Sequence, residues 1–395
     1  MSVRTGREFL SIPGPTNIPD AVLNAMHQPA IDIYKKDFPE LTEQLLADLR
    51  NLFQTKGKSF IFIANGHGAW EAALSNTLNR GEKILVLESG LFANGWGDTG
   101  ATLGLDVEVL SGSWSEAVKP DAVEKRLKED TNHEIKAILM VQVDTASSLS
   151  NDVQAVGEAI RASGHPALFM VDTIASLGTM PFQMDDWGVD VAVSAAQKGL
   201  MSPPGLSFNA AGKRALERHQ TANLRTAYWD WTARMGDVHY QKYCGTPPEH
   251  HLFALRKSFD ILHEEGIEGA SLRHSLLAGA TWAAVSKWAE GGVLQFNVPN
   301  PADRAPAVTT VLFKDGYAPA DLLDYCDKKC GVIIGIGIGA LDGKAVRIAH
   351  MGFANAPMLL GTLSVMEMGL KALGIPHGAG GTQAAIEYLA ENVPA

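Results

Sequence analysis

Short apolar runs alternate with amphipathic stretches between residues 58 and 211. The runs predict strands, and the intervening patterns predict helices; the strand segments are 59–64, 83–89, 105–110, 136–143, 167–172, 189–194 and 205–210. Strands that are almost continuously apolar and alternate with helices are typical of a mostly parallel sheet covered on both faces. We therefore expect an α/β fold in this part of the chain.

The pattern changes after about residue 250. Two long helical segments, 250–266 and 270–291, lead into a region with predicted strands at 307–313, 331–339 and 344–352 and a helix at 357–374. This order predicts two domains. We place a large domain, with the N-terminal segment, at 1–265 and a smaller C-terminal α+β domain at 266–395.

Composition and charge narrow the class of protein. Hydrophobic residues make up 46% of 395 residues, which allows a sizeable core. The net charge of −11 argues against nucleic acid or an anionic membrane as the main partner. We find no signal peptide and no apolar window long enough to span a membrane. The three cysteines form no disulfide framework, so we expect a cytoplasmic protein.

The cysteines also raise the question of a metal site. Cys326 and Cys330 are four residues apart and would share a helix face, but no histidine or further cysteine stands nearby. Structural zinc needs four ligands, so no metal is expected.

Ligands of open parallel sheets bind beyond the carboxyl ends of the strands. One such end is Asn65-Gly66-His67-Gly68, between a predicted strand and a predicted helix. Its glycines let an anion approach the backbone, and the helix offers unpaired N–H groups at its positive dipole end. The segment predicts a phosphate site, although taken alone an ordinary tight turn is the simpler interpretation.

Three lone charges stand in apolar surroundings. Asp172 is the only charged residue from Ala167 to Met184, and Lys198 is the only one from Val191 to Gly212. A desolvated lysine has a depressed pKa and attacks carbonyls, whereas most lysines are solvated surface groups. Asp172 could instead cap a turn. Arg347 lies in a predicted strand of alternating pattern. Its guanidinium could bind a carboxylate through two hydrogen bonds, or it could face outward to solvent.

Together these features suggest one cofactor. Pyridoxal phosphate needs a lysine for its Schiff base, a carboxylate for its pyridinium nitrogen and a cup for its phosphate. A nicotinamide enzyme is the rival interpretation because of the glycines in 335–340. The dinucleotide motif requires a helix directly after the glycines, and here a turn and a strand are predicted, so we reject it.

The chain resembles the class V aminotransferases, which are fold type I pyridoxal-phosphate enzymes, and within them the serine–glyoxylate and alanine–glyoxylate branch. The resemblance runs almost end to end. It is carried by Pro13-Gly14-Pro15-Thr16-Asn17-Ile18-Pro19, Asn65-Gly66-His67-Gly68-Ala69-Trp70-Glu71, His165-Pro166-Ala167-Leu168, Gln197-Lys198-Gly199-Leu200, Pro203-Pro204-Gly205-Leu206, Thr246-Pro247-Pro248 and Arg347-Ile348-Ala349-His350-Met351-Gly352.

The resemblance implies roles around the cofactor ring. Lys198 would bind pyridoxal phosphate covalently and move the proton of the substrate α-carbon. Asp172 would pair with the pyridinium nitrogen. Phe92 aligns with the aromatic residue that stacks on the ring, with Trp96 as the fallback. Thr145 matches the hydroxyl near the ring oxygen.

The resemblance also implies how the phosphate and the substrate are bound. The phosphate cup would consist of Asn65, Gly66, His67 and Gln197. Tyr243 and Thr246 match residues that reach the phosphate from the other subunit, which implies a homodimer with shared sites. Arg347 would hold the carboxylate of a small amino acid or a 2-oxo acid.

Two departures leave the amino donor open. Serine–glyoxylate enzymes carry Asp-His-Arg where this chain has Asp32-Ile33-Tyr34, and relatives often have Thr-Gly where it has Ser147-Ser148. We therefore assign Tyr34 to the substrate site as the residue that selects the donor, although a surface aromatic is the plainer interpretation.

We expect transfer of an amino group to glyoxylate or another short 2-oxo acid, and three alternatives stay open. Pyridoxamine–pyruvate aminotransferase shares a tyrosine near Tyr34 but replaces the glutamine before the lysine, so Gln197 favours bound pyridoxal phosphate. A lyase or desulfurase on the same scaffold is another alternative. Class V desulfurases need a cysteine on a mobile loop, whereas Cys326 and Cys330 are predicted to be helical. A catalytically silent binding protein is disfavoured because Lys198 and Asp172 are both present.

Overall fold

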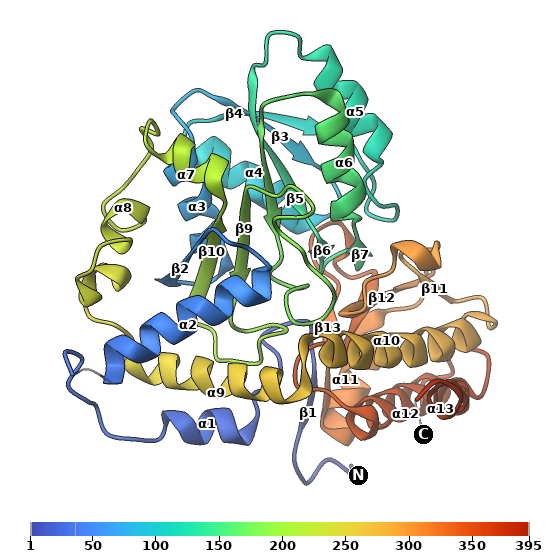
Figure 1. The fold of residues 1–395 in the computed structure, drawn as a ribbon. Coiled ribbons are helices and arrows are strands. Elements are labelled where there is room, and N and C mark those ends of the chain that lie inside the picture. The colour runs from blue at the N-terminus through green and yellow to red at the C-terminus, as the bar shows by residue number, and fades with distance from the viewer. Residues whose placement is uncertain (1, 36, 394–395) are drawn as a thin grey trace.

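The computed structural model describes residues 2–35 and 37–393. Its larger sheet has seven strands and fills the upper part of the molecule (Figure 1). Across the sheet the order is β2 (Lys58–Ile63), β10 (Leu206–Ala211), β9 (Val191–Ala195), β8 (Leu168–Asp172), β5 (Ile135–Val141), β3 (Lys83–Leu87) and β4 (Asp106–Leu110). The five strands from β9 to β4 are parallel, and β10 runs antiparallel to both of its neighbours. The strands predicted from 59–64 to 205–210 are therefore confirmed to within two residues.

Both faces of this sheet are covered, because successive side chains of a strand point to opposite sides. In β8, Phe169 and Val171 pack into one core and Leu168 and Met170 into the other. The first core is closed by α2 (Asp37–Phe53), α5 (Pro120–Glu129), α6 (Val153–Ser163) and α9 (Glu249–Glu265). The second is closed by α3 (Gly66–Thr77), α4 (Leu91–Thr102), α7 (Lys213–His219) and α8 (Trp231–Arg234).

A second sheet lies at the lower right of Figure 1. Its order is β1 (Phe9–Ser11), β13 (Val332–Ile336), β14 (Ala345–Ala349), β12 (Val308–Phe313) and β11 (Leu294–Phe296). Only β1 and β13 pair in parallel. The helices packed on it are α10 (Ile267–Ala289), α11 (Pro319–Tyr325), α12 (Ala356–Ala372) and α13 (Gly381–Asn392). The strand β1 of the N-terminal segment thus joins the C-terminal sheet, a pairing that the sequence did not indicate; the boundary at 265/266 stays a prediction.

Short elements complete the chain. The helix α1 (Asp20–Met26) packs along α9. The other short elements are the hairpin of β6 (Val143–Asp144) and β7 (Leu149–Ser150), the 3-10 turns η1 (His239–Tyr243), η2 (Pro301–Asp303) and η4 (Gly339–Leu341), and the π-helical turn η3 (Cys326–Cys330). The glycines of 335–340 lead through η4 into β14 and not into a helix, as the rejection of a dinucleotide motif required. Among the described residues no helix is long and apolar enough to cross a membrane.

Candidate active site

A cavity of about 280 Å³ opens at the carboxyl ends of β5, β8 and β9, at the edge of the sheet where α3 and α4 begin. This is the edge of the sheet at which a ligand was expected. The predicted site residues that line the cavity are Asn65, Gly66, His67, Phe92, Thr145, Asp172, Gln197 and Lys198. Residues 133 positions apart in sequence, from Asn65 to Lys198, therefore meet in one pocket.

Asp172 is the last residue of β8 and is buried. Its carboxylate accepts one hydrogen bond of 2.6 Å from Trp70 Nε1 and another of 2.6 Å from the backbone N–H of Ile174. Burial raises the pKa of Asp172 to about 7, against the opposing effect of these two donors and of the Lys198 charge. The carboxylate is thus held in a fixed position and would gain from a cationic partner in the cavity.

Lys198 lies in the turn after β9 and is partly buried. Its Nζ contacts the carbonyl oxygen of Pro13. Burial and the nearby Arg347 charge lower the pKa of Lys198 to about 8, while Asp172 and Asp144 act in the opposite direction. A lysine that is partly neutral near pH 8 can act as a nucleophile toward a carbonyl group.

The N-terminal segment 13–19 covers this lysine. The Thr16 N–H donates to the Gln197 carbonyl at 3.0 Å, and its hydroxyl donates to the Lys198 carbonyl at 3.0 Å. A Cβ on Gly14 would lie 2.6 Å from Lys198 Cδ and Cε, and its φ of +107° also favours glycine. The Pro-Gly-Pro-Thr motif therefore packs directly against the active-site lysine.

The start of α3 forms one wall of the cavity. Asn65 caps this helix, because its side-chain oxygen accepts from the His67 N–H at 3.1 Å. A Cβ on Gly66 would lie 2.3 Å from Ile174 Cδ1, so a larger residue here would require the Ile174 side chain to move. The side-chain oxygen of Gln197 is buried and has no hydrogen-bond partner among the described residues. The N–H groups at the start of α3 fit a phosphate group, to which Gln197 could donate only from its amide N–H₂. The amine and carboxylate of the same cavity fit the rest of pyridoxal phosphate.

The structure separates the two aromatic candidates. Phe92 lines the cavity, and its ring lies edge-on to Trp70 with centroids 6.4 Å apart. Trp96 does not line it; the Trp96 ring stacks on Trp70 at 6.0 Å and is fully buried. Of the two candidates, Phe92 is therefore the one that faces the cavity, and the fallback Trp96 supports Trp70 from behind.

Arg347 stands in β14 of the smaller sheet and is 8% exposed, so it does not face outward to solvent. Its Nε donates to the Ile336 carbonyl at 2.6 Å and its Nη1 to the Thr145 carbonyl at 2.9 Å. Burial lowers the pKa of Arg347 to about 10, and its charge acts on Lys198. The guanidinium joins the smaller sheet to the cavity wall without itself lining the cavity.

Within one chain the structure does not bring Tyr34, Tyr243 or Thr246 into the cavity. The Tyr34 side chain is 74% exposed, and Thr246 is exposed as well. Tyr243 is buried in its own chain, where its hydroxyl lies 2.8 Å from the Thr42 hydroxyl. Their predicted roles would require a second copy of the chain.

Both serines of the second departure are buried and lie outside the cavity lining. The Ser147 hydroxyl donates to the Ser89 carbonyl at 2.9 Å. Ser148 has a φ of +64°, a conformation that favours glycine, and its hydroxyl oxygen accepts from the Thr310 N–H at 3.1 Å. These contacts hold the turn after Thr145 and indicate a structural reason for the change.

Two residues at the site carry no prediction from the sequence. Trp70 binds Asp172, and Asp144 is a buried carboxylate directly before Thr145. The signal for Asp144 was present, because it follows the apolar run 136–143 as Asp172 ends the run 167–172.

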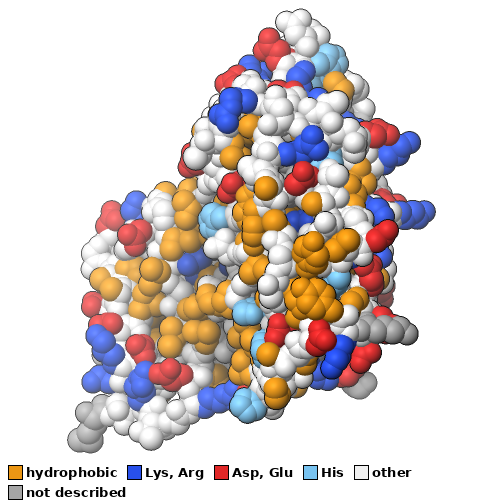
Figure 2. All heavy atoms as spheres, turned by 90° about the vertical axis from the view of Figure 1, so that its left-hand side faces the viewer, with side chains coloured by type: hydrophobic (Ala, Val, Ile, Leu, Met, Phe, Trp, Pro, Cys, Tyr) orange, Lys and Arg blue, Asp and Glu red, His pale blue; other side chains and the backbone are white. Residues whose placement is uncertain are grey.

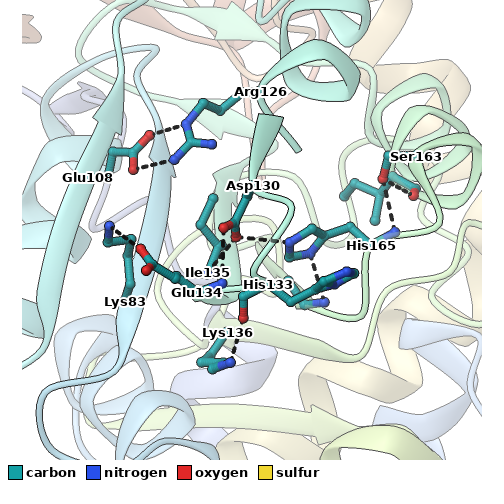
Figure 3. A network of polar contacts seen from close by, with 12 residues as sticks. Lys83, Glu108, Arg126, Asp130, His133, Glu134, Ile135, Lys136, Ser163 and His165 are labelled. Carbon is teal, nitrogen blue, oxygen red and sulfur yellow. Dashed lines mark hydrogen bonds and ion pairs between the residues drawn. The ribbon is translucent and has the colours of Figure 1, made fainter. Parts of the chain in front are cut away.

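The His165-Pro166-Ala167-Leu168 motif lies at the opposite edge of the sheet, before β8 (Figure 3). His165 Nδ1 accepts from the Ala167 N–H at 3.2 Å, so the neutral ring donates from Nε2 to Asp130 at 3.0 Å. Burial lowers the pKa of His165, with Asp130 opposing. Asp130 also accepts from the N–H of Ile135, the first residue of β5. This network secures the starts of β5 and β8 and takes no part in the cavity.

Comparison with known proteins agrees with this geometry. The family model described as aminotransferase class-V matches residues 9–351. The serine–glyoxylate aminotransferase of Methylorubrum extorquens is 39% identical over 398 residues, covering 98% of each chain. The L-aspartate–glyoxylate aminotransferase of Paracoccus denitrificans is 33% identical, covering 99% of this chain and 98% of the relative.

A solved structure shows the same fold. The pyridoxamine–pyruvate aminotransferase of Mesorhizobium loti superimposes with a TM-score of 0.90 over 100% of both chains, at 24% identity. The sequence match, the shared architecture and the motifs around Lys198 lead to one conclusion. The chain belongs to the class V aminotransferase family and is an aminotransferase with the fold type I architecture.

Proposed function

We propose that the enzyme uses pyridoxal phosphate to move an amino group from a small amino acid to glyoxylate or another short 2-oxo acid. The observation that carries this proposal is the meeting of the Lys198 amine and the Asp172 carboxylate in one cavity at the carboxyl edge of the sheet. Both glyoxylate-dependent relatives match this chain along almost its whole length, which supports glyoxylate as the acceptor.

The cofactor, when bound, supplies an electron-accepting ring that stabilises negative charge at the substrate α-carbon. Lys198 would bind it covalently and then hold or move the proton of that carbon. Asp172, fixed by Trp70, would keep the ring nitrogen protonated through its negative charge. Asn65, Gly66, His67 and Gln197 would hold the phosphate group. Phe92 would support the ring, and Thr145 would offer its hydroxyl to the ring oxygen.

Arg347 is the residue that we assign to the substrate carboxylate. Its Nε and Nη1 already bind backbone carbonyls, so the guanidinium has a fixed orientation. A fixed guanidinium recognises a carboxylate with little loss of side-chain entropy. Amino acids and 2-oxo acids both carry this group, so one residue would serve both halves of the reaction.

We infer a homodimer in which Thr246, exposed in its own chain, reaches the cofactor phosphate of the other subunit. Tyr243 would do the same only if its hydroxyl left Thr42, which it contacts inside its own chain. Hydrophobic side chains spread over the face on which α8 lies (Figure 2). Exposed hydrophobic residues of the segment around α8 and η1 include Tyr228, Met235, Val238 and Tyr240. Exposed apolar side chains in this segment support an interface on this face. In such a dimer Tyr34, exposed in its own chain, could contact substrate only in the neighbouring site. The cytoplasmic location stays a prediction.

Pyridoxamine–pyruvate chemistry is the second candidate, and its solved representative shares the fold. Gln197 beside the start of α3 argues for a phosphorylated cofactor held in place, which disfavours a free vitamer as substrate. A desulfurase is disfavoured further, because Cys326 and Cys330 form the turn η3 and Cys326 is buried.

A half-reaction screen tests the proposal. Purified enzyme loaded with pyridoxal phosphate is mixed with single amino acids, and the visible band of the lysine-bound cofactor is followed. We expect conversion to pyridoxamine phosphate with at least one small donor, and its reversal by glyoxylate. Lys198→Ala serves as the control and should show neither change. Conversion of free pyridoxamine with pyruvate, and of no amino acid, would establish the second candidate instead.

A further inference from the structure

Asp144 lies between two walls of the active-site cavity. Its carboxylate accepts hydrogen bonds from the N–H groups of Phe92 at 2.8 Å and Ala93 at 3.2 Å, in the first turn of α4. It also accepts from the Ala146 N–H at 3.0 Å, in the turn after β6. Phe92 and Thr145 line the cavity, whereas Asp144 does not. One carboxylate therefore joins the segment of the stacking residue to that of the hydroxyl residue.

The space around this carboxylate is closed. A Cβ on Gly90 would lie 2.3 Å from the carboxyl carbon of Asp144 and 2.5 Å from each oxygen. Gly90 has a φ of 163°, which is extended backbone that any residue adopts. Glycine is therefore required at position 90 for space alone. The carboxylate is fully buried, and a Cβ at position 90 would have to displace it from its hydrogen bonds.

The charge of Asp144 also reaches the site. The groups that act on the Lys198 amine come from three strands: Asp172 of β8 and Asp144 of β6 favour its protonated form, and Arg347 of β14 disfavours it. The pKa of Asp144 is raised, because the effect of burial exceeds that of the N–H groups of Ala146, Ala93 and Phe92, which act in the opposite direction. These N–H donors and the positive end of the α4 dipole stabilise the ionised carboxylate.

We propose that Asp144 is a positioning residue: its buried carboxylate fixes Phe92 and Thr145 around the cofactor. The charge of Asp144 acts in the same direction as that of Asp172 on the nitrogen of Lys198. This inference rests on the proposed function, because the nitrogen concerned is the one that binds pyridoxal phosphate. Asp144 acts through its neighbours and through its field, without touching the cavity.

The test compares cofactor-loaded wild type with Asp144→Asn, Gly90→Ala and a control, Asp190→Asn. Asp190 is also a buried carboxylate, which accepts from the Phe169 N–H at 2.8 Å and lies outside this cavity. Two quantities are measured: the dissociation constant of pyridoxal phosphate, and the pH at which the visible band of the lysine-bound cofactor titrates. Melting temperatures report general destabilisation.

We expect Asp144→Asn to titrate about half a pH unit or more below wild type and to bind the cofactor about tenfold more weakly. Gly90→Ala displaces the carboxylate but keeps its charge, so affinity should fall while the titration shifts less. Asp190→Asn should lose stability and keep the wild-type titration.

Three results would overturn the inference. The first is a wild-type titration in Asp144→Asn, and the second is an equal shift in Asp190→Asn. The third result applies if Asp144→Asn does not fold: it is an unchanged affinity of Gly90→Ala for pyridoxal phosphate. A wild-type protein that binds no pyridoxal phosphate would instead overturn the proposed function itself.

Discussion

The indole nitrogen of Trp70 donates a 2.6 Å hydrogen bond to the carboxylate of Asp172, and both side chains are buried. Burial raises the pKa of Asp172, and the bond from Trp70 acts in the opposite direction, so that the pKa is about 7 with the bond in place. Without it Asp172 would be protonated more readily at neutral pH. The activity of the site would then depend on Trp70, which lines the cavity and holds this carboxylate in place.

The first prediction follows from this bond. Trp70→Phe keeps the aromatic packing and removes the donor, so the acid limb of the kcat/KM profile should move upward by about one pH unit. Turnover at pH 7 should fall about fivefold, because raising the pKa of Asp172 from about 7 by one unit lowers its ionised fraction at pH 7 from about one half to about one tenth. The matched control is Trp96→Phe, because Trp96 stacks on Trp70 without binding Asp172. Equal profiles for the two variants would contradict the role of the bond.

The second prediction concerns the pH dependence of Lys198. Only the neutral amine attacks an aldehyde, and burial lowers its pKa from 10.5 to about 8. The initial rate of bond formation between cofactor-free protein and pyridoxal phosphate should rise about tenfold per pH unit below 8 and level off above it. A lysine side chain in a short peptide provides the control. A rate that rises in parallel with the peptide toward pH 10 would show an unperturbed lysine.

The third prediction concerns Arg347. Replacing it with lysine removes a bidentate contact and should cost about 2–4 kcal/mol of transition-state binding free energy. The resulting fall in kcat/KM should be equal for donors and for glyoxylate. Arg304→Lys is the control, because Arg304 also donates to two backbone carbonyls, of Val298 and Pro299, outside the cavity. A loss confined to the donors would contradict a shared carboxylate site.

The fourth prediction separates Tyr34 from Arg347. Tyr34→Phe should change the preference among amino donors and leave glyoxylate use less affected. The reason is that Tyr34 belongs to the segment in which this sequence differs from serine–glyoxylate enzymes. Parallel kcat/KM measurements over serine, alanine and aspartate decide this. Uniform values would support the plainer interpretation, a surface aromatic, which agrees with its 74% exposure in one chain.

The fifth prediction concerns shared sites. Lys198→Ala and the double variant Tyr243→Phe/Thr246→Ala should each be nearly inactive. Mixing them with subunit exchange should restore about a quarter of wild-type activity, because half of the dimers combine both chains and have one intact site. Failure to recover activity after confirmed exchange would mean that each site is built within a single chain.

The strands and the cavity residues could be predicted because local pattern determines them. A lone charge at the end of an apolar run, such as Asp172, marks a strand end directly. The helix α4 was not anticipated: its sequence, with Gly95, Gly97 and Gly100, has weak helical propensity, and tertiary packing overrides it. Close packing of Gly97 on Val86 and of Gly100 on Ile84 explains these glycines.

Other features depend on contacts between distant segments, which a single sequence does not reveal. The pairing of β1 with β13 joins residues more than 320 positions apart. The Trp70–Asp172 bond and the carboxylate of Asp144 are likewise tertiary contacts. The contact between the Tyr243 hydroxyl and the Thr42 hydroxyl in α2 is a further tertiary contact, and it holds the Tyr243 side chain inside its own chain.

Transfer of labelled nitrogen tests the central claim most directly. The enzyme is incubated with glyoxylate and, in separate reactions, ¹⁵N-labelled serine, alanine or aspartate, and the glycine formed is analysed by mass spectrometry. The account predicts ¹⁵N-glycine from at least one donor with wild-type enzyme and none with Lys198→Ala. Glycine-free reactions with every donor, or label released as ammonia, would contradict an aminotransferase that uses glyoxylate through Lys198.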